Sequence, residues 1–225
     1  MTLDTGIADM CFVNDHSKNT CSIRSPKIYV FNDPIDTPEM LGFLDAILEL
    51  NILRAYRQGS VLEPTPTVIL AKKISPDASS YFETICKMLN GPGGDTIPLL
   101  IVSDIHQEDL FEDIAHMCGA PLIKKYLNPD IQKEDIDKGL APTPETIKEF
   151  CGSADLVVSD LTKTKFINPS KMFNEDGSYS NEYKSVLSFL ENELKKAQDA
   201  GEGINKTGRL KRRINSFKGN MIDLL

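Results

Sequence analysis

Three apolar runs of strand length, each followed by a helical pattern, constrain the fold of this chain most. The runs lie at 27–31, 67–71 and 97–102, and turn-forming residues bound each of them, so we predict three buried strands. A strand followed by a helix, three times in succession, is typical of an α/β fold. The helical segments are EMLGFLDAILEL after Pro38, SSYFETICKML after Ser75-Pro76-Asp77, and Glu108 to Met117, which Gly119 closes.

The second half of the sequence changes in character. A short helix at 143–150 precedes a fourth strand at 154–159, and the segment TKTKFI that follows is expected to form a hairpin arm. From Asn181 a long amphipathic helix, SVLSFLENELKKAQDA, runs to a break at 201–208, and a second helix around RLKRRINSF follows. The expected fold class is therefore α/β, with β-sheets or a sandwich flanked by helices and a C-terminal antiparallel helix pair.

The end of the chain and two surface segments bear on its domain organisation. The sequence finishes on an apolar run at 221–225, which we interpret as a strand cut where the protein would continue. We therefore expect residues 1–225 to form a single domain excised from a longer protein. Two segments rich in turn formers, 54–66 and 169–183, are predicted to be insertions or surface loops.

Charge and hydropathy limit the expected partners. The 33 acidic and 25 basic residues give a net charge of -8, which disfavours binding to a phosphate backbone, so we expect no nucleic-acid partner. No apolar run approaches the roughly 18 to 20 residues of a spanning helix, and the first ten residues lack the features of a signal peptide. We expect a cytoplasmic protein without a membrane partner.

Cysteine and histidine usage bears on metal binding. The five cysteines at 11, 21, 86, 118 and 151 are scattered, with no C-x-x-C pair and no histidine at ligand spacing. The sequence therefore predicts reduced thiols and no metal site.

Aspartates follow several of the predicted strands and offer the one candidate for catalysis. Asp33, Asp104 and Asp160 lie where ligand-binding groups gather in α/β sheets, so a hydrolase or phosphotransferase using Asp104 or Asp160 is an alternative function. The segment VVSDLTKT is faintly similar to the aspartate-nucleophile phosphatases, but Thr162 stands where that chemistry needs a second acid. An aspartate at a strand end is more often a turn or helix cap.

Apolar residues give a different signal in two helices. The helix after Pro38 and the helix after Ser75 each carry apolar side chains over a wider arc than a one-sided amphipathic helix needs. Two neighbouring helices of this kind can form a groove for a peptide, or both can simply be buried on two sides. The pattern alone favours neither reading. The apolar residues are Met40, Leu41, Phe43, Leu44, Ile47 and Leu48 in the first helix, and Tyr81, Phe82, Ile85, Cys86, Met88 and Leu89 in the second.

Read in order, several segments resemble the apical domain of the group I (GroEL-like) chaperonins. DTGIADMCFVN and the Ser25-Pro26 step into KIYVF are similar to the start of that domain, and IDTPEMLGFLDAI resembles its first groove helix. EDIAHMCGAPLI and TIKEFCGSADLVVSDLTKTKFI resemble its later helix, strand and hairpin, and RLKRRINSFKGNMIDLL resembles its closing helix and strand. The resemblance covers about Leu3 to Ile222, and it rests on the collinear order of modest matches rather than on one diagnostic motif.

The resemblance implies a function and a set of contact residues. The chain would bind non-native polypeptides in a hydrophobic groove between two helices, the groove that in the family also binds a co-chaperonin lid. Carried over residue by residue, the contacts fall on Ile7, Cys11 and Phe12 in the N-terminal segment, Leu41 and Leu44 in the first groove helix, and Tyr81, Ile85 and Cys86 in the second.

The resemblance also implies an ATP-driven, homo-oligomeric parent ring whose equatorial ATPase and intermediate domains are absent from this chain. We therefore expect no catalytic residue and no cofactor here, ATP and Mg²⁺ being held by the absent equatorial domain, and we expect the isolated chain to be a monomer. Ile7 and Cys11 replace aromatics of the family, and SDIHQED replaces its Gly-Phe-Gly-Asp stretch. Such departures suit a distant member, for example one encoded by a bacteriophage, and they leave the co-chaperonin open.

A third reading is a scaffold domain that binds one fixed partner through the same apolar face. It differs from the chaperonin reading in predicting high selectivity, and the sequence does not separate the two.

Overall fold

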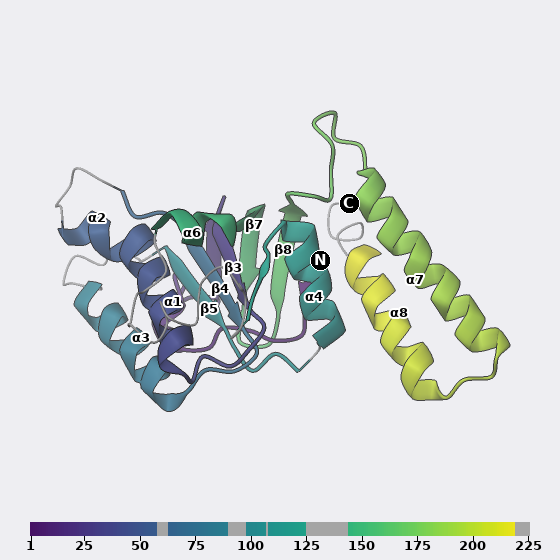
Figure 1. Ribbon diagram of the computed structural model, residues 1–225, viewed down its shortest axis with the longest axis horizontal. Helices are drawn as coiled ribbons and strands as arrows, with labels where there is room; N and C mark the ends of the chain where they lie inside the picture. Colours follow the sequence, from purple (N-terminus) through teal and green to yellow (C-terminus); the bar gives the residue numbers. More distant parts are fainter. Residues whose placement is uncertain (58–62, 90–97, 107, 125–143, 219–225) are drawn as a thin grey trace.

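The computed structural model describes residues 1–57, 63–89, 98–106, 108–124 and 144–218. Over these residues a mixed sheet forms the centre of the molecule, two helices cover one end of it, and a pair of helices projects from the other end (Figure 1). The predicted α/β class with a C-terminal antiparallel helix pair is confirmed.

A parallel sheet forms the core of the fold. The three predicted strands are present as β3, β4 and β5, and their pairing is parallel and in register, Lys27 lying opposite Thr67 and Thr67 opposite Leu99. All three are buried almost throughout, as expected for parallel strands covered on both faces. The bounds are β3 Lys27–Phe31, β4 Thr67–Ala71, β5 Leu99–Val102 and the short parallel β6 Leu122–Ile123 beside β3.

An antiparallel extension completes the sheet, in the order β1-β8-β7-β3-β4-β5. The predicted hairpin is confirmed: β7 pairs antiparallel with β8, and it also pairs with β2 and with the start of β3. The first residue of β7 is Gly152, and the position suits glycine because a Cβ there would lie 2.5 Å from the Cys118 carbonyl oxygen. The bounds are β1 Thr2–Leu3, β2 Cys21–Arg24, β7 Gly152–Ser159 and β8 Thr164–Pro169.

The helices begin where their start signals predict. In α1, Pro38 occupies the first turn and the Thr37 hydroxyl accepts a hydrogen bond from the Met40 amide. Helix α4 ends at Gly119, whose φ of 68° is the left-handed conformation typical of a helix C-terminus. The bounds are α1 Pro38–Leu48, α3 Pro76–Leu89, α4 Glu108–Cys118, α6 Pro144–Glu149, α7 Asn181–Asp199 and α8 Ile204–Lys218.

Two boundary predictions are wrong. Residues 54–57 do not start a loop. η2 (Glu49–Leu53) and α2 (Arg54–Arg57) continue α1 as one helical stretch, since no glycine or proline occurs between Leu48 and Gly59. Helix α8 begins at Ile204 and includes Gly208, so the break is shorter than 201–208. An interior glycine costs a helix only about 1 kcal/mol, which packing of the apolar face offsets. The strand predicted at 221–225 lies outside the described residues.

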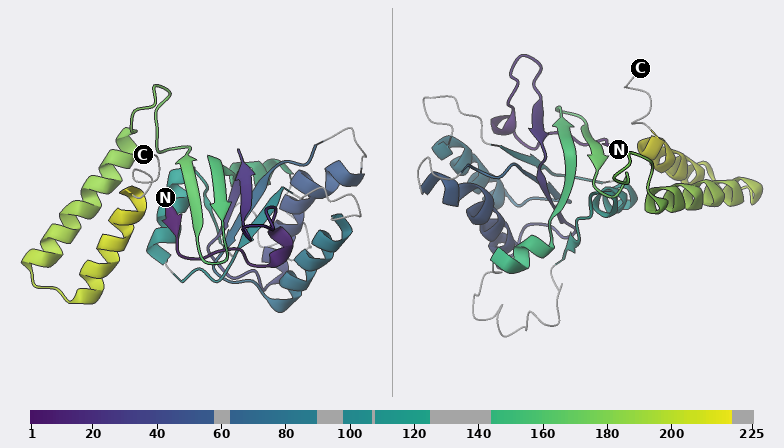
Figure 2. Two further views of the ribbon diagram at one scale, coloured as in Figure 1. Left: turned by 180° about the vertical axis from the view of Figure 1, so that it is seen from behind. Right: turned by 90° about the horizontal axis from the view of Figure 1, so that it is seen from above.

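The helix pair is attached to the body where α7 begins and α8 ends. Figure 2 shows α7 and α8 as a hairpin whose far end extends away from the sheet. In the predicted surface segment 169–183, residues 170–180 form a turn between β8 and α7. Its aromatic rings stack one on the next, from the turn to the helix pair. Ring centroids are 4.9 Å apart for Phe173 and Tyr179, 4.6 Å for Tyr179 and Tyr183, and 5.8 Å for Tyr183 and Phe217.

Candidate functional site

Three segments that are far apart in sequence lie together at one end of the sheet. They are the one-turn helix η1 (Met10–Phe12), α1 and α3, which carry all but one of the contact residues implied by the chaperonin resemblance. Phe12 of η1 packs edge-to-face on Phe82 of α3, with ring centroids 6.2 Å apart. On the α1 side of α3, the Tyr81 hydroxyl donates a hydrogen bond to Asp45 Oδ1. Helix α3 is therefore joined to η1 through one aromatic residue and to α1 through the preceding one.

The N-terminal segment is fixed by its backbone. The Ile7 amide donates to the Asp160 carbonyl at 2.9 Å, and the Ala8 amide donates to the Ile101 carbonyl at 2.9 Å. Gly6 permits this approach, because a Cβ there would lie 2.1 Å from the same Asp160 oxygen. Asp9 then caps η1 by accepting a hydrogen bond from the Cys11 amide at 2.8 Å. The segment therefore holds η1 at a fixed place beside α3.

The implied contact residues differ in their exposure. Four of them are buried in the core: Ile7, Phe12, Leu44 and Ile85. Three are partly exposed at the surface: Cys11, Leu41 and Tyr81. Cys86 lies on α3, but its side chain lies outside the described residues. The binding role of all eight stays a prediction. Of the seven whose side chains are described, the three partly exposed ones can touch another chain without a rearrangement.

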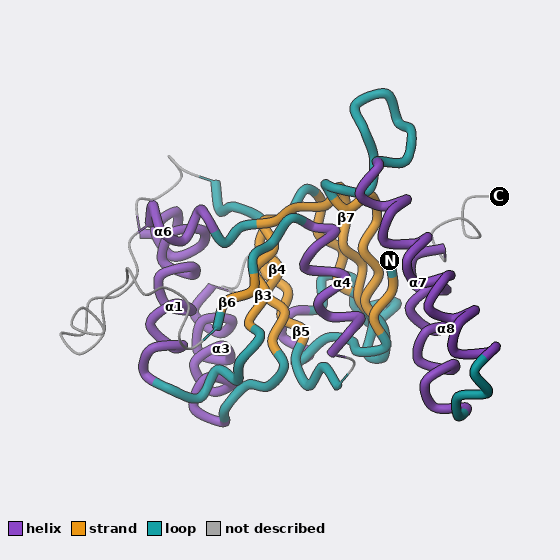
Figure 3. Tube along the Cα trace, turned by 45° about the vertical axis from the view of Figure 1, so that its right-hand side comes forward, coloured by secondary structure: helices purple, strands orange, loops and turns teal. Residues whose placement is uncertain are grey.

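The wide apolar arc of α1 is explained by burial rather than by exposure. Of its six apolar residues, only Leu41 retains partial exposure. The reason is that α1 is covered on two sides: it packs on the sheet, and α6 lies beside it (Figure 3), where the Phe43 and Phe150 rings meet with centroids 5.9 Å apart. Of the two alternatives that the sequence left open, burial on two sides is therefore the one that holds for α1.

One exposed residue was missed by the reasoning from sequence. Met10, the first residue of η1, is 49% exposed, although it directly precedes the candidate Cys11. The sequence signal for η1 is a capping aspartate at position 9 followed by three apolar residues. Three residues are too few to show a helical periodicity. We name four apolar side chains of these segments the α1–α3 surface: Met10, which is exposed, and Cys11, Leu41 and Tyr81, which are partly exposed.

Polar contacts border the α1–α3 surface. Burial raises the pKa of the Tyr81 phenol, and the hydrogen bond to Asp45 and the charges of Asp45 and Glu49 raise it further. The phenol is thus a neutral donor at physiological pH. Nearby, Arg57 Nη1 pairs with Glu49 Oε1 at 2.8 Å, which ties α2 back onto η2.

The strand-end aspartates Asp160 and Asp104 differ in their surroundings. Asp160 Oδ1 accepts hydrogen bonds from the Thr162 amide at 2.6 Å, the Thr162 hydroxyl at 2.8 Å and the Lys163 amide at 2.9 Å. Burial opposes ionisation of Asp160, but these hydrogen bonds outweigh it and hold its pKa below the ordinary value. Asp104 is exposed and has a left-handed φ of 60°. Asp160 therefore caps the β7–β8 turn, as the sequence favoured.

In the described part of the chain, no three His, Cys, Asp or Glu side chains cluster in a way that would hold a metal ion. Among the helices described, none combines the length and the apolar character needed to cross a bilayer.

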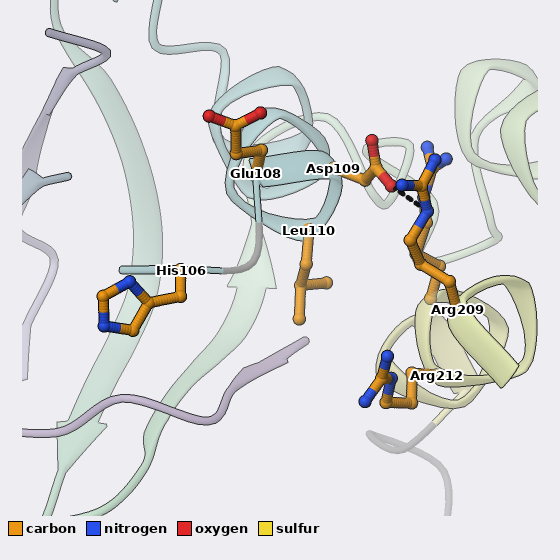
Figure 4. Close-up of a pocket in the computed structure, with 7 residues that line it drawn as sticks. His106, Glu108, Asp109, Leu110, Arg209 and Arg212 are labelled. Carbon is orange, nitrogen blue, oxygen red and sulfur yellow. Dashed lines mark ion pairs between the residues drawn. The ribbon is translucent and has the colours of Figure 1, made fainter. Parts of the chain in front are cut away.

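A pocket of about 310 Å³ lies away from the α1–α3 surface, between the start of α4 and α8. Figure 4 shows His106 and Leu110 on one side of it and Arg209 and Arg212 on the other, with Asp109 turned toward Arg209. Arg209 Nε and Asp109 Oδ2 are 2.8 Å apart. Arg213, which also lines the pocket, pairs with Asp113 of α4, so two ion pairs attach the helix pair to the body here.

Comparisons with known proteins bear on the fold. No protein-family model matches the chain, and no curated protein matches it in sequence. Two crystal forms of the chaperonin gp146 from the bacteriophage EL 2 (Pseudomonas aeruginosa), both in the presence of ATP-BeFx, match it in structure. Their TM-scores are 0.57 and 0.55, at 14% and 15% sequence identity, over 96% of this chain.

The matches extend over only part of the solved chaperonin. This chain spans 35% and 36% of the length of the two matched chains. At this level of identity the likeness establishes the fold, and the described α/β sheet with its projecting helix pair is accordingly a chaperonin-like fold.

Proposed function

We propose that this chain is the polypeptide-binding segment of a chaperonin of the group I type, and that it captures non-native polypeptides on the α1–α3 surface. The observation that carries the proposal is the meeting of η1, α1 and α3. The resemblance implies contact residues that, except for Ile7, lie in these three segments. In the fold the three segments lie beside one another. The bacteriophage origin of the matched structures also suits the divergent residues of this chain.

The chemistry of the surface supports a receptor of low selectivity. Unfolded polypeptides share exposed apolar groups and little else, so a receptor for them needs apolar side chains rather than a fixed array of polar groups. Met10 and Leu41 offer flexible, unbranched or γ-branched apolar groups, and Tyr81 offers an aromatic ring whose hydroxyl is already occupied. Methionine in particular adapts to partners of different shape.

Energetics predict weak binding by one copy. Each apolar side chain that becomes fully buried contributes about 1.5–3 kcal/mol, whereas association costs about 4–15 kcal/mol. Four partly exposed side chains therefore leave little net affinity. In the proposed parent, a homo-oligomeric ring would present several copies to one client. Its ATP and Mg²⁺ would be held by equatorial residues outside this chain, and a co-chaperonin would compete for the same surface.

The test uses fluorescein-labelled α-lactalbumin, reduced and carboxymethylated so that it cannot fold, with binding followed by fluorescence anisotropy. We expect weak, Mg²⁺-independent binding that Met10→Ser plus Leu41→Ser weakens roughly tenfold, as the loss of two contacts predicts. Leu44 is unsuitable for this test, because it has no exposed surface and Leu44→Ser would destabilise the core.

The matched control is Phe189→Ser, which removes a 60% exposed apolar side chain from α7, far from the α1–α3 surface. Equal weakening by this control would mean that binding is not localised at η1 and α1. No binding at any attainable protein concentration would reject the proposal. Binding of native α-lactalbumin as tightly as the unfolded form would favour a receptor for folded partners instead.

A further inference from the structure

The hydrogen bond between Tyr81 and Asp45 spans the two helices of the proposed binding surface. Asp45 projects from α1 into solvent, and the Tyr81 hydroxyl reaches it from α3. The neighbouring residue Phe82 points the other way, onto Phe12 of η1. Two consecutive aromatic residues thus fasten α3 on both sides, by a polar contact toward α1 and by an apolar contact toward η1.

The apolar residues beside this hydrogen bond are covered. Leu44 directly precedes Asp45 and has no exposed surface, and Ile85, one helical turn after Tyr81, is also buried. Both are contact residues by the resemblance, yet neither can touch a client in the present arrangement. Separation of α1 from α3 would break the Tyr81–Asp45 hydrogen bond.

We propose that the Tyr81–Asp45 hydrogen bond is a latch that holds the α1–α3 surface in a low-affinity, closed form, so that client binding is coupled to its opening. This inference rests on the proposed function and adds the residues that set its affinity. The latch lies at the water-exposed side of the helices, so it is weak enough for a client to open. Its ring and its hydroxyl have opposite effects: the Tyr81 ring contributes contact area to a client, and the hydroxyl restrains the helix that carries it.

Coupling of binding to opening predicts how much the apparent affinity changes when the latch is removed. A ligand that binds only the open form has an apparent affinity reduced by the fraction of molecules that are open. Removing one partly exposed hydrogen bond to a carboxylate shifts that fraction by roughly three- to tenfold. Tyr81→Phe deletes the hydroxyl and keeps the ring, so it isolates the latch. Glu193→Gln is the control, because it removes an exposed charged contact, to Lys196, on α7 and leaves the surroundings of Tyr81 and Asp45 unchanged.

The first measurement is anisotropy with reduced, carboxymethylated α-lactalbumin. We expect Tyr81→Phe to bind the probe roughly three- to tenfold tighter than the unmodified chain, and Glu193→Gln to bind it as the unmodified chain does. Equal affinity of Tyr81→Phe and the unmodified chain would overturn the latch and leave the proposed function intact. Absence of binding by both proteins would reject the proposed function and the latch with it.

The second measurement needs no client. Hydrogen exchange followed by mass spectrometry should show faster exchange of the α3 amides between Pro76 and Ile85 in Tyr81→Phe than in the unmodified chain, with α7 unchanged as an internal reference. Unchanged exchange in α3 would overturn the latch even if client binding were observed. The two measurements therefore distinguish a failure of the latch from a failure of the binding surface.

Discussion

Arg213 and Asp113 join α8 to α4 through two parallel hydrogen bonds, Nε to Oδ2 and Nη2 to Oδ1, each 2.8 Å long. The Asp113 side chain is 9% exposed and that of Arg213 is 22% exposed, so water screens this pair weakly. The hydrogen bonds to Asp113 raise the pKa of the Arg213 guanidinium further. One turn earlier on both helices, Asp109 and Arg209 form a second pair that is mostly exposed on the arginine side.

Asp113→Ala is expected to destabilise the chain by about 2–4 kcal/mol, because it leaves a largely buried guanidinium without its partner. Urea denaturation followed by circular dichroism measures the loss. Asp109→Ala is the control, and it should cost less than about 1 kcal/mol because Arg209 is solvated. Similar losses for the two variants would show that the bidentate pair is no more important than an ordinary surface pair.

The Met1 amino group makes the chain that begins at Met1 less stable in mild acid. It donates to the Phe166 carbonyl at 2.7 Å, and burial lowers its pKa from 8.0 to about 5. Between these values the unfolded chain binds a proton that the folded chain does not, so the free energy of unfolding rises as the pH increases from about 5 to about 8. The slope is at most about 1.4 kcal/mol per pH unit.

Urea denaturation at pH 5.5, 6.5 and 7.5 measures this slope, and Nα-acetylated protein supplies the comparison. Acetylation removes the titrating group, so the acetylated chain should lose the rise in stability over this range. A steric cost of the acetyl group would shift its curve by a constant and leave the slope absent. If both forms show the same slope, the Met1 amine does not cause it.

Two glycines should respond to alanine in opposite directions. Gly152→Ala places a methyl group against the Cys118 carbonyl and Ala120, both within 2.7 Å of the new Cβ, and we expect a loss of about 2–3 kcal/mol. Gly208 lies inside α8 with open space around it, so Gly208→Ala should stabilise the chain by about 0.5–1 kcal/mol. Thermal unfolding of the two variants gives the sign of each effect. A stabilising Gly152→Ala would contradict the close approach of β7 to α4.

Presentation of several copies should raise the affinity for a long client. Fusing the chain to a ring-forming carrier should tighten binding of carboxymethylated α-lactalbumin by about 10²- to 10⁴-fold, provided that one client can reach two copies at once. A short apolar peptide that reaches only one copy is the control and should gain little. Equal gains for the long client and the short peptide would indicate that the carrier changes the chain itself.

Much of the fold was predictable because local signals and tertiary packing agree. The bounds of β3 and β4 coincide with the predicted apolar runs, and Pro38 and Gly119 mark helix ends through the fixed φ of proline and the permissive φ of glycine. β2 was missed, because its four residues alternate between buried and exposed over too short a stretch to register as a pattern.

The candidate site was predictable only in part. The three segments that meet could be named from the resemblance, but exposure could not, since Phe43 is covered by Phe150, which follows it by about a hundred residues. The Tyr81–Asp45 hydrogen bond joins residues 36 positions apart and leaves no trace in a helical periodicity. Met10 is exposed because of a one-turn helix, which no periodicity predicts.

The bridge between Ile7 and Val102, with the Ala8 amide on the Ile101 carbonyl, has a consequence for how a client can be held. β5 is the outermost strand at one edge of the sheet. An uncovered edge strand can pair through its backbone with another extended chain, so an unfolded polypeptide could add to the sheet there. The N-terminal segment occupies that position near the end of β5. Under the proposed function, a client would therefore be held by side-chain contacts, which form and break without separating a row of backbone hydrogen bonds, and it could be released intact.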